Sequence, residues 1–122
     1  MTLVDSSAWI HSLRTDGDAT VTRRVRLLLE TGEAAWCPIV RLELWNGARG
    51  EHEKRVLREM ERDLTELVFS QPVWHESYDL ARKARRGGIT APATDVLIAA
   101  CARHYDVDVE HDDEHLAALL AL

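Results

Sequence analysis

The chain has 122 residues, of which 46% are hydrophobic, and its 21 acidic and 15 basic residues give a formal net charge of −6. This length and composition predict one domain, spanning residues 1–122, with enough apolar material for its own core. The acidic excess argues against a protein that simply coats nucleic acid, which would carry a basic excess. It does not exclude an enzyme that acts on nucleic acid and gathers its acidic residues in one pocket.

Signals for membrane insertion, export or disulfide formation are absent from the sequence. No stretch approaches the length of a membrane span, and the N-terminus lacks a basic region followed by a long apolar run. Cys37 and Cys101 lie far apart in apolar surroundings, which favours two buried thiols over a disulfide or a metal pair. We therefore expect a cytoplasmic protein with no membrane partner.

Short apolar runs and longer amphipathic segments alternate along the chain. Residues 2–4 predict a strand, and a helix is expected to begin near Ser6. The later segments predict, in chain order, a helix over ATVTRRVRLLLETG, a strand over EAAWCP, helices over IVRLELWNGARG and HEKRVLREMERDLTELVF, a short strand over VFSQP, helices over SYDLARKARRGG and ITAPATDVLIAACARHY, a strand over DVDVE and a helix over DEHLAALLAL. The helix in TDVLIAACARHY is the most apolar, so we expect it to be central.

The order of these elements predicts the fold class. Strands separated by helices imply parallel strands joined by crossover connections, and therefore an α/β fold with helices on both faces of the sheet. In open sheets of this kind, ligands bind outside the carboxyl ends of the strands. Residues that directly follow the predicted strands are therefore the first candidates for a functional site.

Four acidic residues are predicted near that edge of the sheet. Asp5 follows the first strand, Asp113 follows the last strand, Asp95 begins the apolar helix, and Glu43 is a charge on an otherwise apolar helix. Each has a simple structural explanation, because Asp caps helices and turns and Glu can face solvent. Together, converging carboxylates repel one another and require a cation. Mg²⁺ or Mn²⁺, which prefer oxygen ligands, are the natural candidates.

A basic cluster supplies a candidate for substrate binding. The stretch LARKARRGG contains Arg82, Lys83, Arg85 and Arg86, which could grip the phosphates of a nucleic acid or could simply form a solvated helix face. His111 and His115 are spaced so that both imidazoles share one helix face, but further ligands for a zinc site cannot be placed from the sequence.

Four motifs, which together span nearly the whole chain, resemble a known family. LVDSSAWI at the start, the glutamate of PIVRLELWNGAR, the stretch TDVLIAACARHY and the late HDDEHLAAL resemble, in that order, the PIN-domain family and in particular its VapC-type ribonuclease toxins. DSSAWI and TDVLIAA are fairly specific, whereas the glutamate motif is weak alone. The resemblance implies a three-layer α/β/α sandwich with a central, mainly parallel sheet.

The resemblance also implies an activity and its partners. It predicts a metal-dependent endoribonuclease that uses Mg²⁺, or Mn²⁺ as a substitute, to hydrolyse RNA. The catalytic and metal-binding residues that it implies are Asp5, Glu43, Asp95 and Asp113. A hydroxyl of Ser7 or Ser6 is expected to orient the first aspartate. The expected partners are a second copy of the chain, in a homodimer, and a cognate VapB-type antitoxin bound across the active site.

The last motif departs from the family pattern. Two residues after the last acid, relatives usually carry an Asp-Phe pair, whereas this chain has His115 and Leu116. Asp113 is assigned as the fourth acid, but the adjacent Asp112 leaves that choice open. Many relatives also continue into an edge strand, which is not evident before Leu122. The alternative to a nuclease is therefore a catalytically silent PIN-like module that binds other proteins.

Overall fold

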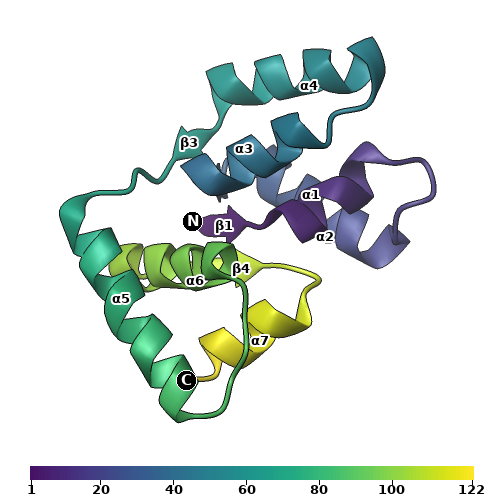
Figure 1. Ribbon diagram of the computed structural model, residues 1–122. Helices are drawn as coiled ribbons and strands as arrows, with labels where there is room; N and C mark the ends of the chain where they lie inside the picture. Colours follow the sequence, from purple (N-terminus) through teal and green to yellow (C-terminus); the bar gives the residue numbers. More distant parts are fainter.

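A four-stranded parallel sheet lies at the centre of the computed structural model, which describes residues 1–122 (Figure 1). The strands are β1 (Thr2–Val4), β2 (Ala34–Trp36), β3 (Thr65–Glu66) and β4 (Asp108–Glu110), in the spatial order β3-β2-β1-β4. Every neighbouring pair is parallel, and Leu3 of β1 lies opposite both Ala35 of β2 and Val109 of β4.

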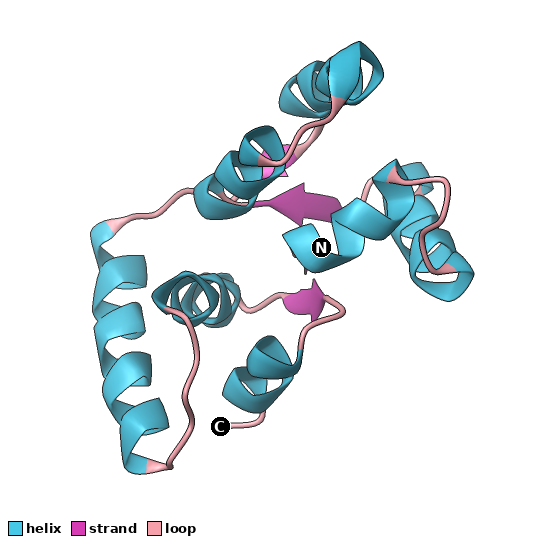
Figure 2. Ribbon diagram, turned by 45° about the vertical axis from the view of Figure 1, so that its right-hand side comes forward, coloured by secondary structure: helices cyan, strands magenta, loops and turns pink.

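Seven helices flank this sheet. They are α1 (Ser6–Leu13), α2 (Ala19–Glu30), α3 (Pro38–Asn46), α4 (Gly50–Asp63), α5 (Gln71–Arg86), α6 (Ala93–Tyr105) and α7 (Glu114–Leu120). In both ribbon views α5, α6 and α7 lie together in the lower half of the molecule and α3 and α4 in the upper half, with strands between them (Figure 2). The predicted α/β/α architecture with a parallel sheet is confirmed.

The central helix is α6, as its composition predicts. Every residue from Asp95 to Ala102 is buried, and the helix packs against α5, α7, α3 and β4. Burial on all sides explains why this segment is apolar rather than amphipathic. It also buries Asp95, the single acidic residue in the first turn of α6.

Three predicted boundaries are wrong. The helix over 52–69 ends at Asp63, and the short strand is at Thr65–Glu66 rather than in 68–72. Leu64 already has an extended backbone, and the N–H of Leu67 donates to the carbonyl of Trp36 on β2. The chain after Asp63 is therefore extended and pairs with β2. The apolar residues there continue the helical spacing only by coincidence. In addition, α5 begins at Gln71, earlier than predicted, with a proline in its first turn.

The C-terminal segment docks on α6 and does not add a strand to the sheet. Leu116 and Leu119 of α7 are fully buried, and the guanidinium of Arg103 donates to the carbonyls of Leu119 (3.0 Å) and Leu122 (2.9 Å). Within residues 1–122, β4 is therefore an edge strand. No helix in the structure is long and apolar enough to cross a lipid bilayer.

Replacing a buried leucine of α7 tests the importance of this docking. We expect Leu116→Ala to lower the free energy of unfolding by about 2–5 kcal/mol, because the cavity cannot fully collapse. Leu27→Ala, at a leucine that is 60% exposed on α2, is the matched control and should cost less than about 1 kcal/mol. Urea denaturation measures both, and equal losses in the two variants would contradict the described packing.

Candidate metal centre

Asp5 occupies the turn between β1 and α1 and has two different environments for its two carboxylate oxygens. Oδ2 caps α1 by accepting from the Ser7 backbone N–H (3.0 Å) and from the Ser7 hydroxyl (2.6 Å). Oδ1 has no hydrogen-bond partner, and water does not reach it because the residue is only 3% exposed. A buried acceptor left unpaired costs free energy. Helix capping therefore accounts for one oxygen of Asp5 and not for the other.

Glu43 approaches the same site from α3. The hydroxyl of Ser6 donates to Glu43 Oε1 at 3.2 Å, which links the start of α1 to the middle of α3. Burial raises the pKa of Glu43 above its ordinary value, and the negative charge of Asp5 adds to the increase, while the Ser6 hydrogen bond opposes it. The charges of Asp95 and Asp113 raise this pKa further. The side chain of Glu43 therefore faces the other acids rather than open solvent.

Asp95 lies in the first turn of α6 and is buried, with 8% of its surface exposed. Burial raises its pKa above the ordinary value, and the charges of Asp113 and Asp5 add to that increase. The nearby imidazole of His115 acts in the opposite direction. Asp95 makes no side-chain capping bond to its own helix, so the simple capping interpretation of this residue is wrong.

Asp113 and His115 come from the start of α7. Asp113 is the N-cap of that helix, where its Oδ1 accepts from the Leu116 N–H at 3.0 Å. His115 Nδ1 lies 3.8 Å from Asp95 Oδ2 and 3.8 Å from Asp113 Oδ1. One ligand atom from each of these three residues lies within 4.8 Å of the others. The loop that follows β4 thus brings Asp113 close to Asp95 at the start of α6.

The adjacent acid, Asp112, points to a different partner. Its Oδ2 lies 2.8 Å from Nε2 of His11, and its backbone N–H donates to the Ser7 hydroxyl at 2.9 Å. Of the two aspartates between which the sequence left the choice open, the structure brings Asp113 next to Asp95 and His115, while Asp112 contacts His11. His115 is the neighbour that the sequence reasoning did not place in the site; its position two residues after Asp113 was the available signal.

The donor set fits a divalent cation. Carboxylate oxygens are the ligands that Mg²⁺ and Mn²⁺ prefer. Side chains from four separate segments share the site, and the unpaired Oδ1 of Asp5 is an acceptor that a cation would satisfy. A positive ion would also offset the mutual repulsion that, with burial, raises the pKa values of Glu43 and Asp95.

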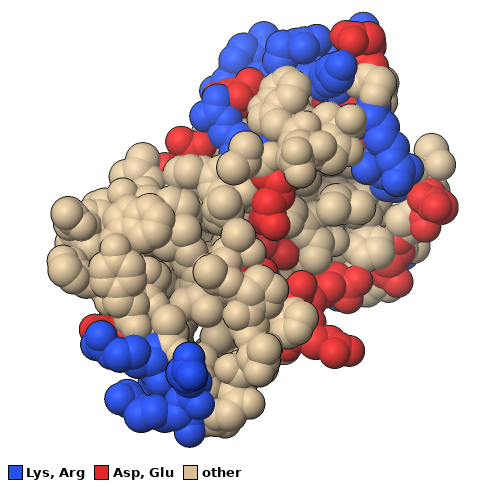
Figure 3. Space-filling model, in the orientation of Figure 1, with Lys and Arg blue, Asp and Glu red and all other residues tan.

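The basic cluster does not lie beside these acids. Arg82, Lys83, Arg85 and Arg86 belong to the C-terminal part of α5, where Arg82 pairs with Asp79. Basic side chains gather at that end of the molecule, while acidic side chains form a band across the middle of the same face (Figure 3). The structure therefore separates the two predicted groups. A bound polymer would have to extend from one to the other.

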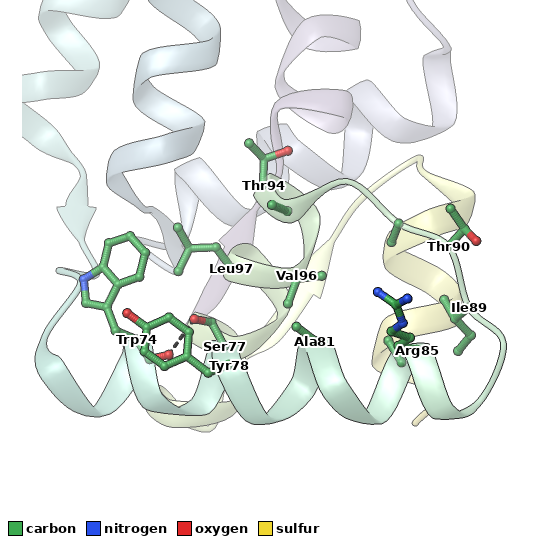
Figure 4. Close-up of a pocket in the computed structure, with 13 residues that line it drawn as sticks. Trp74, Ser77, Tyr78, Ala81, Arg85, Ile89, Thr90, Thr94, Val96 and Leu97 are labelled. Carbon is green, nitrogen blue, oxygen red and sulfur yellow. Dashed lines mark hydrogen bonds between the residues drawn. The ribbon is translucent and has the colours of Figure 1, made fainter.

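The largest groove is also distinct from the acids. It has a volume of about 650 Å³, lies between α5 and the N-terminal part of α6, and is mostly apolar, with Trp74 and Tyr78 at one end and Arg85 toward the other (Figure 4). Thr94, which precedes Asp95, is on its rim, but none of the four acids lines it. A carboxylate-metal centre does not require a deep pocket, so we place the candidate chemistry at the acids.

A parallel α/β/α sandwich whose acids converge after the strands is an architecture suited to metal-dependent nucleases. The model of the PIN domain family matches residues 2–120, and the chain belongs to that family. The predicted family membership is confirmed over almost the entire sequence.

Several similar proteins are named as ribonucleases. Ribonuclease VapC11 of Mycobacterium tuberculosis is 29% identical over 116 residues, which cover 93% of this chain and 87% of that protein. Ribonuclease VapC21 of the same species is 30% identical over 105 residues, covering 84% and 76% of the two chains.

Similar solved structures agree with the fold. The crystal structure of FitAcB from Neisseria gonorrhoeae has a TM-score of 0.72 at 22% identity, covering 98% of this chain and 93% of that one. The VapBC2 structure from Rickettsia felis, bound to a DNA fragment from its promoter, has a TM-score of 0.71 at 16% identity, covering 88% and 84%.

The raised pKa of Asp95 predicts a pH-dependent stability in the presence of a chelator. A carboxyl whose pKa is higher in the folded state favours folding below its ordinary pKa, and that contribution is lost as the pH rises through the folded value. We expect the loss of stability between mildly acidic and neutral pH to be smaller in Asp95→Asn than in the wild type. The exposed Asp16→Asn is the control and should follow the wild type in urea denaturation. Identical pH profiles for wild type and Asp95→Asn would show that Asp95 is not held as described.

Proposed function

We propose that this protein is a Mg²⁺-dependent endoribonuclease, with Mn²⁺ as a substitute, that acts as the toxin of a VapBC-type pair. The observation that carries the proposal is the convergence of Asp5, Glu43, Asp95 and Asp113 around an unpaired buried oxygen, in a PIN-domain chain. The ribonuclease names of similar proteins support the choice of reaction. The proposed location is the cytoplasm, where cellular RNA is accessible.

Each acid has a proposed role that follows from its surroundings. Asp5 and Asp95, the two buried carboxylates, hold the metal directly, and Ser7 fixes the orientation of Asp5. Glu43 and Asp113 complete the metal site or move a proton; the raised pKa of Glu43 makes it the better suited of the two to hold one. The bound ion would supply positive charge that lowers the barrier to phosphodiester hydrolysis.

Substrate binding is proposed for the basic end of α5. Lys83, Arg85 and Arg86 have no ion-pair partner in the structure, so they are free to contact phosphates beyond the scissile bond. Arg82 belongs to the same cluster. The metal-assisted reaction needs no 2′-hydroxyl, so the choice of RNA over DNA is supported by the relatives and not by the site.

The proposal includes two protein partners. One is a second copy of the chain, which light scattering would detect as a mass twice the 13.8 kDa of one chain. The other is a VapB-type antitoxin that covers the active site. Structures of FitAcB and VapBC2 support partners of this type for the fold. A neighbouring reading frame that encodes a small DNA-binding protein would support the antitoxin directly.

Adjacent aspartates provide a sharp test of the active site. We expect Asp113→Asn, Asp5→Asn and Asp95→Asn each to reduce cleavage of a labelled RNA in Mg²⁺ by more than ~100-fold, because each loses charge at the metal. Asp112→Asn, whose side chain contacts His11 instead, is the matched control and should remain active. Circular dichroism checks that the variants are folded. Full activity of Asp5→Asn or Asp95→Asn would refute the proposal.

Metal addition should stabilise the protein. A cation that binds only the folded state raises the free energy of unfolding by about 2.7 kcal/mol when its concentration is ~100 times the dissociation constant. We expect the melting temperature of the chelator-treated protein to rise with added Mg²⁺ or Mn²⁺, and the rise to be lost in Asp95→Asn. A melting temperature that is independent of millimolar metal would count against a metal centre.

The alternative function is a catalytically silent module that binds proteins. Its basis is the departure at His115 and Leu116 from the family pattern. Intact RNA after long incubation with metal, together with tight binding of a protein partner, would favour this alternative over the nuclease.

A further inference from the structure

His115 occupies an unusual place in the acidic site. It is two residues beyond the helix cap Asp113, on the first turn of α7, and its Nδ1 is equidistant, at 3.8 Å, from Asp113 Oδ1 and Asp95 Oδ2. The three residues come from two helices that pack against each other. The imidazole therefore lies beside the carboxylates because the fold places it there, and not only because it follows Asp113 in the chain.

We propose that His115 Nδ1 is a ligand of the metal centre, together with Asp95 and Asp113, and that it shifts the preference of the site from Mg²⁺ toward Mn²⁺ and later first-row ions. The inference rests on the proposed function only in so far as that function requires a divalent ion at these acids. It goes beyond it by adding a nitrogen ligand and a metal selectivity.

The spacing of the three side chains is compatible with one shared ion. Protein oxygen and nitrogen ligands lie ~2.1 Å from a small divalent ion, so two ligands of the same ion can be separated by at most ~4.2 Å. The distances of 3.8 Å from His115 Nδ1 to the two carboxylates fall inside that limit. All three ligand atoms lie within 4.8 Å of one another, which is close to that limit.

A second observation points to a ligand independently of this spacing. Asp5 Oδ1 has no hydrogen-bond partner in a residue that is 97% buried, while the charge of Asp5 acts on both Glu43 and Asp95. The residue that carries this unsatisfied acceptor is therefore an electrostatic neighbour of the same acids. Asp95 is also buried, whereas the His115 side chain is 54% exposed. The nitrogen therefore closes the solvent side of a site whose inner side is built from oxygen.

The type of ligand determines which ion is favoured. Mg²⁺ and Mn²⁺ both bind carboxylates, but imidazole nitrogen suits Zn²⁺, Fe²⁺, Co²⁺ and Ni²⁺, and Mg²⁺ least. An acid at this position would add negative charge and another hard oxygen. The imidazole adds neither, so exchanging it for a carboxylate should favour Mg²⁺ relative to the ions that prefer nitrogen.

Mn²⁺ itself can serve as the probe, because pulsed electron paramagnetic resonance detects a nitrogen nucleus bonded to it. We expect the full-length wild type with one equivalent of Mn²⁺ to show ¹⁴N coupling, and His115→Gln to lose that coupling. The affinity of His115→Gln for Mn²⁺ should fall by ~10-fold or more, the loss already typical of residues that merely support a ligand. His75→Gln, an exposed histidine on α5, is the control and should change neither quantity.

A second variant tests the selectivity. His115→Asp should bind Mg²⁺ more tightly than the wild type, and its ratio of Mn²⁺ affinity to Mg²⁺ affinity, measured by calorimetry, should fall. A ratio equal to that of the wild type would overturn the proposed selectivity. Melting curves of the metal-free variants confirm that both are folded, so a loss of coupling cannot be ascribed to unfolding.

The outcomes separate this inference from the proposed function. If the wild type binds Mn²⁺ but shows no ¹⁴N coupling, or if the coupling persists in His115→Gln, His115 is not a ligand and the nuclease proposal stands. If the wild type binds neither Mn²⁺ nor Mg²⁺, the metal-dependent function fails and this inference fails with it.

Discussion

Repulsion between carboxylates is the constraint on which the site depends. Asp5, Glu43, Asp95 and Asp113 are brought near one another although burial and mutual charge oppose their ionisation, as the raised pKa values of Glu43 and Asp95 show. Such an arrangement persists only if the rest of the fold holds it. The buried helix α6, packed against α5, α7, α3 and β4, supplies that support. The core of this domain is therefore what keeps an electrostatically unfavourable site assembled.

Helix capping and metal binding are compatible uses of the same residues. Asp5 and Asp113 are both N-caps, and in each case one oxygen accepts from a backbone N–H of the following helix. That bond fixes each carboxylate in place; in Asp5 the second oxygen is left unpaired, whereas in Asp113 the capping Oδ1 is also the oxygen that lies 3.8 Å from His115 Nδ1. The capping interpretation of Asp5 is confirmed for Oδ2, and the unpaired Oδ1 is the oxygen left for the proposed metal. A helix-capping hydrogen bond can therefore hold a carboxylate in position to bind a metal ion.

The sequence predicted the architecture well because it depends on local patterns. Alternating short apolar runs and amphipathic segments are enough to indicate parallel strands with crossover helices, and the strand-end rule then places Asp5 and Asp113 at one edge. The boundary at Asp63 was missed because Leu64 and Leu67 continue a helical spacing, whereas Thr65, Glu66 and the N–H of Leu67 pair with β2. Local periodicity cannot report a hydrogen bond to a distant strand.

Details of the candidate site were less accessible, because they depend on tertiary distances. The sequence could not distinguish Asp112 from Asp113, since only the path of the loop after β4 decides which of them faces Asp95. It likewise gave no reason to expect that Ser6 would reach Glu43 across the gap between α1 and α3. The sequence predicted the serine hydroxyl that holds Asp5, which the structure shows to be that of Ser7, but not the hydrogen bond that holds Glu43.

The hydroxyl of Ser7 has a consequence for how the site responds to an incoming ligand. It donates to Asp5 and accepts from the backbone N–H of Asp112, so the turn after β1 and the turn after β4 share one oxygen atom. Rotation of the Asp5 carboxylate would break this bridge. The orientation of the carboxylate is therefore fixed before a metal ion binds. Metal binding would therefore cost the Asp5 side chain little further conformational entropy. The turns after β1 and β4 are consequently held together through the Ser7 hydroxyl.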